Sequence, residues 1–547
     1  MNKKNEKLSE KNLLSSWQSK IANAEKKYAD YFRLVKKTRD IYKDARLESD
    51  SLKNGHYNLF WSSIETLKPF LYFKQPAVHI ERQNKTSSPA QKMACRILEK
   101  ALNWCLSQTD FDSTIKYARN DFLISGAGIL WEHYEPQFET LEENMEIKIS
   151  EKVISQYVDP SCFLADCDNV GIWEDVSWIA RKTYLSPQEI KNMFGQEALS
   201  SLALLSSKED KKNLCVYEVW DKNEKKVYWF EKNACKFLKI AEDPLHLKGF
   251  FPCPKPLFAT LTNDSIIPVP DYALIKELLD ELNGVNQRMK MITQAFKISG
   301  AYDSSFPDLV NILEKENVLV AVQDFMKLKE NGGLKGIVDF MPLEQYVTAL
   351  SQLAERRQDI MNQIYEITGV SDIMRGNSNA AETATAVTKK TNFGTLRNQD
   401  RQNEMQRFIR DLYRLKAEMI AEMFDTGFLI DLLSPEERKN MELVYQGVTL
   451  LKEEKIRGML FTVEAENIIN RDEEINQTSA AVQSINTIIQ SAFKIVSSQP
   501  LLLPLYKSMV EVLTQYLPKA RPFEPVLENV FSSIEQDLNK SKKSSGT

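Results

Sequence analysis

Five acidic residues form the group in this sequence best able to do chemistry together: Asp159, Asp166, Asp168, Glu174 and Asp175. Carboxylate oxygens are the ligands that Mg²⁺ and Ca²⁺ prefer, and a divalent ion held here would suit nuclease-like hydrolysis. Their spacing matches no calcium-loop template, because an EF-hand needs D-x-D-x-D-G followed by a late Glu. We therefore expect a solvated loop at 159–175 and no metal site.

A zinc site or a catalytic nucleophile is also not indicated. The seven cysteines are scattered without a CxxC pair, and the chain has four histidines. Cys162, Cys167 and His133 could supply three zinc ligands, but buried free thiols and a packed histidine are the simpler interpretation. The patterns GxxxxGK[ST], GxSxG and HExxH do not occur, and SGAGIL at 125–130 lacks the third glycine of a dinucleotide site. We expect no enzyme activity and no cofactor.

Five arginines are spaced along a long helical pattern: Arg397, Arg401, Arg407, Arg410 and Arg414. Steps of three and four residues place them on parts of two helix faces, where guanidinium groups could contact DNA phosphates. Acidic residues such as Glu404 and Asp411 lie between them and permit ion pairs within the helix or between subunits. We expect ion pairing more than direct contact with DNA.

Composition indicates an ordinary soluble protein with several cores. The 547 residues suggest three or four core-sized units, and 43% hydrophobic with 27% charged residues allow large cores. The formal net charge of −5 excludes a bulk basic field that would grip nucleic acid. The charged start MNKKNEKLSE lacks the apolar region of a signal peptide, and no run is apolar enough to cross a bilayer. We expect a reducing, cytoplasmic setting.

The first half of the chain changes from helical to β patterns. Residues 10–50 predict an amphipathic helical arm, and 91–123 predict one or two helices. From 136 to 260 the signals are mostly β. They include a strand at VSWIARKTY, a capping box at SPQE that opens a short helix, and a hairpin formed by VYEVW and KVYWF. The proline-rich passages FFPCPKPLF and IIPVPD fit edge strands or linkers.

Two long helices are predicted next, at 271–298 and 342–367, with a small mixed insert at 299–341 between them. These segments predict a helical hairpin with the insert as a small unit at its tip. A third long helix runs from Asn379 as N-cap to Phe424, where Gly427 is predicted to stop it. Its middle is polar nearly all round, so it should not fit in the core of one chain and should bridge domains or neighbouring copies.

The rest of the chain carries a strand pattern, MLFTVEA, and then three helical patterns at 471–497, 502–516 and 523–539 before a polar tail. We find no internal repeat.

Several passages, in one order, resemble the portal or head-to-tail connector proteins of tailed bacteriophages, above all those of short-tailed phages. They are WSSIETLKPFLYFKQPAV, DFLISGAGILWEHY, YVDPSCFLADC, VSWIARKTYLSPQEIKNMFG, LTNDSIIPVPDYALIKELLDELNGVNQRMKMI and ITGVSDIMRGNSNAAETATA, which leads into NFGTLRNQDRQNEMQRFIRDLYRLKAEMIAE. The similarity covers roughly residues 55–425.

The resemblance implies an α+β, predominantly α-helical protomer that assembles into a ring, usually of twelve copies. Its parts would be an N-terminal arm 1–54, wing 55–270, stem helices 271–298 and 342–367, clip 299–341, tunnel loop 368–380, long wing helix 381–427, crown 428–540 and tail 541–547.

The same resemblance implies a structural protein without catalysis. The ring would occupy one capsid vertex of the virion, after assembly in the host bacterial cytoplasm, and double-stranded DNA would pass through it during packaging and ejection. Expected partners are the terminase large subunit, head–tail adaptor or tail proteins, and the major capsid and scaffolding proteins. No membrane partner is expected.

The loop GVSDIMRGNSNAAETATA would line the narrowest part of the channel. The tunnel-loop residues implied by the resemblance are Gly369, Ser371, Asp372, Arg375, Gly376, Asn377 and Ser378. Glycines would supply hinges, and Arg375, if it faced the lumen, would form a ring of charge. Duplex DNA carries a negative charge every ~1.7 Å, so a strongly basic lumen would hold the genome instead of passing it.

Two alternative functions, from other classes of protein, remain. One is a metal-dependent nucleic-acid enzyme that uses the acidic loop 159–175. The other is a helical scaffold or adaptor protein without a pore, whose long helices bind other proteins.

Overall fold

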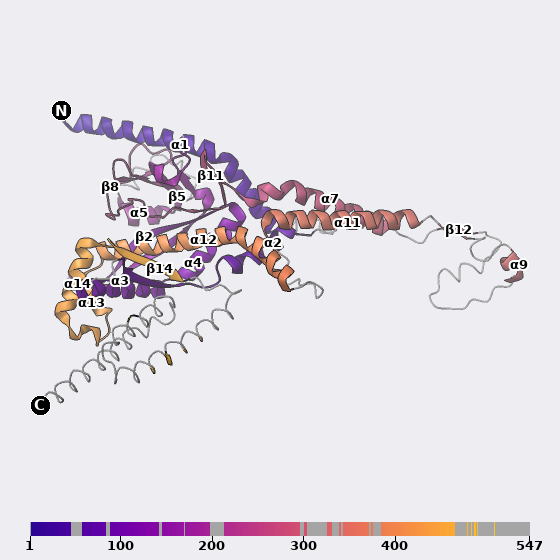
Figure 1. The fold of residues 1–547 in the computed structure, drawn as a ribbon. Coiled ribbons are helices and arrows are strands. Elements are labelled where there is room, and N and C mark those ends of the chain that lie inside the picture. The colour runs from indigo at the N-terminus through magenta and orange to yellow at the C-terminus, as the bar shows by residue number, and fades with distance from the viewer. Residues whose placement is uncertain are drawn as a thin grey trace.

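The chain folds as a mixed α and β protein, which confirms the α+β class (Figure 1). The computed structural model describes residues 2–44, 57–83, 88–141, 145–168, 170–196, 213–295, 300–302, 325–330, 338–340, 343–370, 374–375 and 384–464, with positions 479, 483, 486, 487, 490 and 508. The body has a sheet half and a helical half, and a helical hairpin projects from it.

The sheet half is a five-stranded antiparallel sheet in the order β4-β5-β6-β7-β8. Its strands are β4 (Phe163–Ala165), β5 (Trp178–Leu185), β6 (Leu214–Asp221), β7 (Lys226–Glu231) and β8 (Lys239–Glu242). The predicted hairpin is confirmed as β6–β7, and the predicted capping box at Ser186 opens α5 (Pro187–Phe194). The proline-rich passages contribute only short strands: β9 (Leu257–Phe258), β10 (Thr260–Thr262) and β11 (Ser265–Val269).

Helix α1 (Asn2–Tyr42) is the predicted amphipathic arm, and it covers this sheet. Its apolar residues recur every three or four positions and so fall on one face. The Trp17 ring centroid lies 5.9 Å from that of Trp178 and 5.5 Å from that of Tyr228. This packing explains why a helix of 41 residues is stable against a sheet rather than free in solution.

A charged cluster fixes α1 on the sheet. Carboxylate oxygens of Glu25 accept hydrogen bonds of 2.8 Å from Tyr217 and Lys232 and pair with Lys182 at 2.8 Å. Burial alone would raise the pKa of Glu25, but these hydrogen bonds outweigh it and lower the pKa to about 2.

The helical half is the largest core. It packs α2 (Leu59–Leu71), α3 (Pro89–Gln108), α4 (Phe111–Ser125), α12 (Ala384–Met423), α13 (Thr426–Asp431) and α14 (Met441–Glu454). Residues 91–123 thus hold two helices. Strand β1 (Ala77–Arg82) pairs with β14 (Met459–Glu464), which brings together two segments that are far apart in the sequence. Residues 428–464, the expected start of a crown, share this core.

The long helix ends close to the predicted Phe424, but the prediction that Gly427 stops it is wrong. Helix α12 ends at Met423, and Gly427 lies inside α13 without the left-handed backbone of a helix-ending glycine. The break comes earlier because Phe424 is buried and the backbone N–H of Asp425 donates to Glu151 at 2.6 Å.

A long hairpin joins the two halves. It consists of β2 (Ala127–Leu141) and β3 (Met145–Val158), and successive residues of β2 enter different cores. Leu130 packs in the helical half, and Ile129 and Trp131 pack beside the sheet. This alternation follows from the period of two along a strand.

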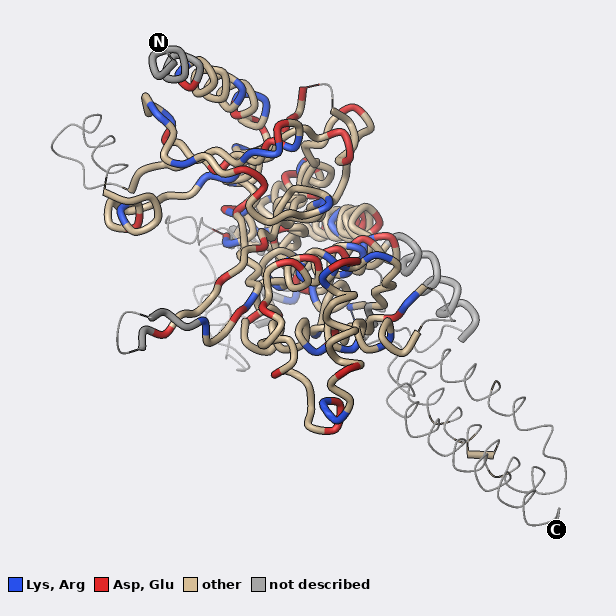
Figure 2. The backbone as a smooth tube through the Cα atoms, turned by 90° about the vertical axis from the view of Figure 1, so that its left-hand side faces the viewer, with Lys and Arg blue, Asp and Glu red and all other residues tan. Residues whose placement is uncertain are grey.

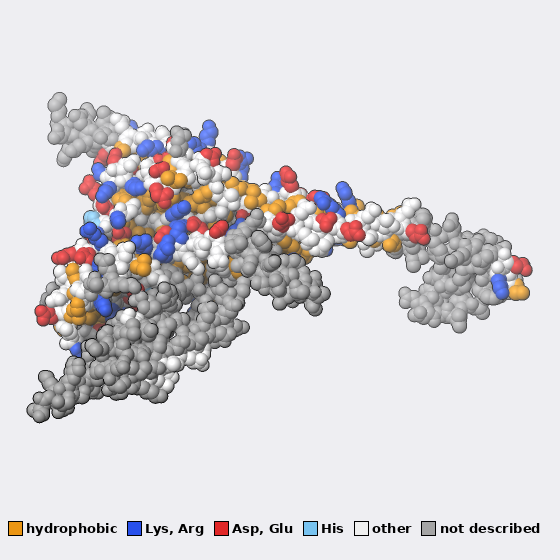
Figure 3. Space-filling view, viewed as in Figure 1, with side chains coloured by type: hydrophobic (Ala, Val, Ile, Leu, Met, Phe, Trp, Pro, Cys, Tyr) orange, Lys and Arg blue, Asp and Glu red, His pale blue; other side chains and the backbone are white. Residues whose placement is uncertain are grey.

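Helices α7 (Asp271–Ala295) and α11 (Leu343–Thr368) form the projecting hairpin, close to the ranges predicted from sequence. The short strands β12 (Gly300–Tyr302) and β13 (Val338–Phe340) and helix α9 (Phe325–Glu330) lie beyond its far end. Lys, Arg, Asp and Glu are interspersed over the described chain (Figure 2), and hydrophobic side chains are exposed along the hairpin (Figure 3). Most of the 299–341 insert and of the helices predicted after 470 lies outside the described residues.

Candidate functional site

The base of the loop at 368–380 lies where α11, α12 and the body meet. Gly369 ends α11 with a left-handed φ of 75°, a backbone conformation that favours glycine. Its carbonyl oxygen accepts a hydrogen bond of 2.8 Å from the Asn398 side chain on α12, and Val370 is buried. The loop is therefore anchored at its first residues. Ser371, Asp372, Gly376, Asn377 and Ser378 lie outside the described residues.

Arg375, expected to form a ring of charge if it faced a lumen, lies against α11 in this structure. Its guanidinium carbon is 3.6 Å from the centroid of the Tyr365 ring, and the side chain is half-buried. A guanidinium group stacked on an aromatic ring is held by the ring's negative face. This contact ties the loop to the projecting hairpin.

The polar middle of the long helix is partly buried within one chain, which corrects the expectation from its sequence. Asn398 and Gln402 are both buried, although their stretch was not expected to fit in the core of one chain. Asn398 donates to the carbonyl of Gly369, and Gln402 donates to the carbonyl of Phe70 at 2.9 Å. Amide side chains in a core can donate hydrogen bonds to backbone carbonyls. The polarity of a residue alone does not show whether its side chain is buried in this way or exposed to water. The side chains of 384–397, including Arg397, lie outside the description.

Two of the five arginines on this helix are engaged inside the chain. Arg401 pairs with Asp271 at 2.7 Å and so joins α12 to the start of α7. Arg407 pairs with Glu404 and Asp411 at 2.7 and 2.8 Å and also donates to two backbone carbonyls of the 243–259 loop. These contacts position α12.

Arg410 and Arg414 are exposed on the same helix. Among the four arginines of this series whose side chains the structure describes, these two are the exposed ones.

The acidic residues at 159–175 do not converge. Asp159 pairs with Arg39 of α1 at 2.7 Å, and Asp168 forms an ion pair with Lys27. Asp166 accepts from the Ser177 hydroxyl. Within the described ranges, no group of three or more His, Cys, Asp or Glu side chains could hold a metal ion, which also applies to Cys162, Cys167 and His133. The geometry therefore gives no support to a metal-dependent nuclease.

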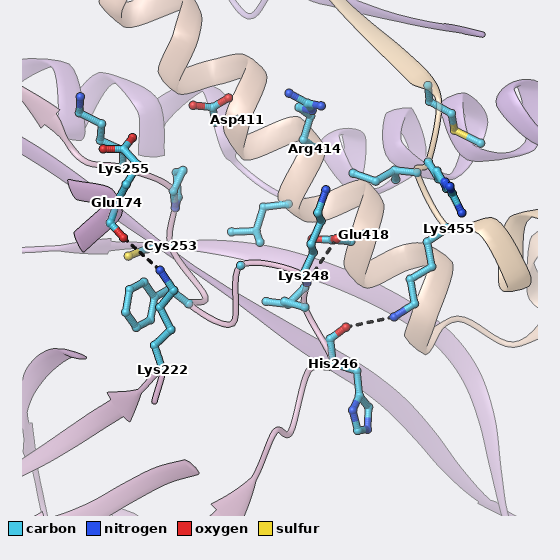
Figure 4. A pocket seen from close by; sticks show the side chains of 18 of the residues that line it. Glu174, Lys222, His246, Lys248, Cys253, Lys255, Asp411, Arg414, Glu418 and Lys455 are labelled. Carbon is cyan, nitrogen blue, oxygen red and sulfur yellow. Dashed lines mark hydrogen bonds between the residues drawn. The ribbon is translucent and has the colours of Figure 1, made fainter. Parts of the chain in front are cut away.

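Sequence reasoning missed one feature, a pocket of about 1140 Å³ between the two halves of the body (Figure 4). It is lined by residues from α12, the 243–255 loop, the β6–β7 turn and the turn before β14. No local pattern could have revealed it, because these segments are far apart in sequence.

Comparison with known proteins adds no assignment. No protein-family model matches the sequence, and no match was found among curated proteins. Among the described helices, none is both long enough and apolar enough for a membrane span.

Proposed function

We propose that the chain is a subunit of a bacteriophage portal, a ring of identical copies around a channel for double-stranded DNA at one capsid vertex. In this role it carries no catalysis. It docks the terminase motor during packaging and later the adaptor and tail proteins, with capsid and scaffolding proteins around it.

The proposal rests on the helical hairpin α7–α11, whose outer part has few contacts with the rest of the chain. At its base it is packed through Ile275, Leu282 and Ile364, but farther out its two helices contact little except each other. Met291 is 64% exposed, and Val347 on the partner helix is 54% exposed. Two helices alone bury too little surface to be rigid, so neighbouring hairpins packed side by side would supply the missing contacts.

The order of elements also supports a conduit. The hairpin leads through Gly369 into the loop, and α12 returns from the loop into the body. In a ring with hairpins side by side, this loop would repeat once per subunit around the axis. Lys, Arg, Asp and Glu side chains are mixed on the face of the molecule shown in Figure 3, and such a mixed surface would let DNA slide without being held.

Electron microscopy of the purified protein tests the proposal directly. We expect closed rings with a central hole. An elongated oligomer without a hole would favour the helical adaptor instead, and a protein that stays monomeric in every buffer at high concentration would contradict the ring.

A pair of methionine variants tests the hairpin contact. Met291→Asp should reduce ring formation strongly, because it places a charge between packed hairpins. Met193→Asp, at a methionine that is 59% exposed on α5 of the body, is the matched control and should leave rings intact. Equal ring yields from the two variants would show that the hairpin is not the interface.

A further inference from the structure

The pocket between the two halves of the body, called here the α12 pocket, is rich in unpaired cations. Among the residues that the structure describes, Lys248, Lys255 and Arg414 have no carboxylate partner, although all three line this pocket. Lys222 and Lys455 also line it and donate to the backbone carbonyls of Glu174 and His246 at 3.1 and 3.0 Å (Figure 4). Unlike the first three cations, Lys455 also has a carboxylate partner, Glu422, at 2.9 Å. In a chain with a formal net charge of −5, such a cluster of cations suits the binding of a negatively charged group of another molecule.

The backbone around this pocket is unusually strained. Six non-glycine residues in the described ranges have positive φ, and four of them line the pocket: Lys225, Asp243, His246 and Lys455. A fifth, Phe250, lies within the same loop. Left-handed backbone in residues with a Cβ costs about 1 kcal/mol or more each, and such residues cluster at binding sites. The loop is therefore held in a shape that local preference does not favour.

A buried carboxyl group completes the pocket. Glu418 is 8% exposed and accepts a long hydrogen bond of 3.4 Å from the backbone N–H of Lys248. Burial raises the pKa of Glu418, although Lys455, Lys248 and Arg414 oppose this.

We infer that the α12 pocket binds a short segment of a partner protein in which one acidic side chain is flanked by apolar ones. The cations would pair with the acidic group, and Leu247, Leu415 and Ile456 supply apolar contacts beside them. This inference goes beyond the ring and does not depend on it.

The same walls argue against nucleic acid as the occupant. Asp411 and Glu454 are among the five carboxylate side chains that line the pocket together with the cations. A DNA backbone carries evenly spaced phosphates and would meet these carboxylates, whereas a peptide can present a single negative charge.

Fluorescence anisotropy with the full-length protein tests this site. The probes are two labelled peptide libraries with Leu, Ile or Phe on each side of a fixed central residue, which is Asp in one and Asn in the other. We expect the Asp library to bind about tenfold tighter or more, because one charge-assisted hydrogen bond contributes about 1.5–3 kcal/mol. Equal binding of the two libraries, or no binding by either, would overturn the inference.

Substitutions in the pocket supply the second readout. Lys255→Gln and Arg414→Gln should each weaken binding of the Asp library about tenfold, with thermal melting unchanged because neither side chain has an ion pair to lose. Lys439→Gln is the control, since Lys439 is exposed and does not line the pocket. If all three variants bind alike, the pocket is not the site. A duplex oligonucleotide that bound more tightly and lost affinity in the same two variants would assign the pocket to nucleic acid instead.

Discussion

Replacement of Lys416 by methionine should destabilise the body by about 3–5 kcal/mol, because it breaks a fully buried ion pair. The Lys416 and Glu132 side chains are both 0% exposed, and their charged atoms are 2.7 Å apart. The ammonium group also donates to the carbonyl of Val153 at 3.0 Å. Without it, Glu132 would keep only the hydrogen bond of 2.6 Å from Ser155 for its buried side-chain charge. Methionine fills most of the volume, so the loss is electrostatic rather than a cavity.

Equilibrium urea unfolding followed by tryptophan fluorescence measures this effect. The double variant Lys416→Met/Glu132→Gln should regain stability to within about 1 kcal/mol of the natural protein, since a neutral amide can still bond to Ser155. Lys116→Met is the matched control: Lys116 forms a partly exposed pair with Asp112 on α4, and its loss should cost only about 0.3–0.5 kcal/mol. A single variant as stable as this control, or a double variant no better than the single one, would refute the reasoning.

Three further predictions concern contacts that position α1, the base of the loop at 368–380 and the projecting hairpin. The pKa of Glu25 falls from 4.5 to about 2 on folding, so its contribution to α1 docking is complete above pH 4.5 and is lost as the pH falls toward 2. Near-ultraviolet circular dichroism should show this loss of docking, and Glu25→Gln should reduce its dependence on pH. Asn398→Ala leaves the carbonyl of Gly369 without its donor, costs about 1–3 kcal/mol locally, and should speed proteolysis of the following loop. Arg401→Met leaves Asp271 buried without its cation and should raise amide exchange at the start of α7, at a cost of about 2 kcal/mol.

Local patterns predicted most of the elements of this fold. The stripe on α1, the capping box at Ser186 and the hairpin of β6 and β7 depend on residues within a few positions of each other. These local patterns predict structure well because the residues that form them are neighbours both in the sequence and in the folded protein. The hairpin α7–α11 was predictable for the same reason.

Non-local and buried polar features were not predictable. The pairing of β1 with β14 joins segments that are distant in the sequence, and the pattern of neither strand indicates which strand it pairs with. Asn398, Gln402 and Lys416 have the residue types of a solvated face, yet each is buried and bonded to a carbonyl or carboxylate. A sequence pattern reports polarity but does not report which polar group will face it in the core.

These buried polar residues give α12 a mechanical role that its exposed arginines do not reveal. From Asn398 to Lys416 the helix rises about 27 Å at 1.5 Å per residue. Along this length it is bonded in turn to the loop base at Gly369, to the start of α7 at Asp271 and to the β2–β3 hairpin at Glu132. The next turn carries Glu418 into the α12 pocket. Since a helix held at both ends transmits a shift of one end to the other, the loop, the projecting hairpin and the pocket should respond together to whatever binds at any one of them.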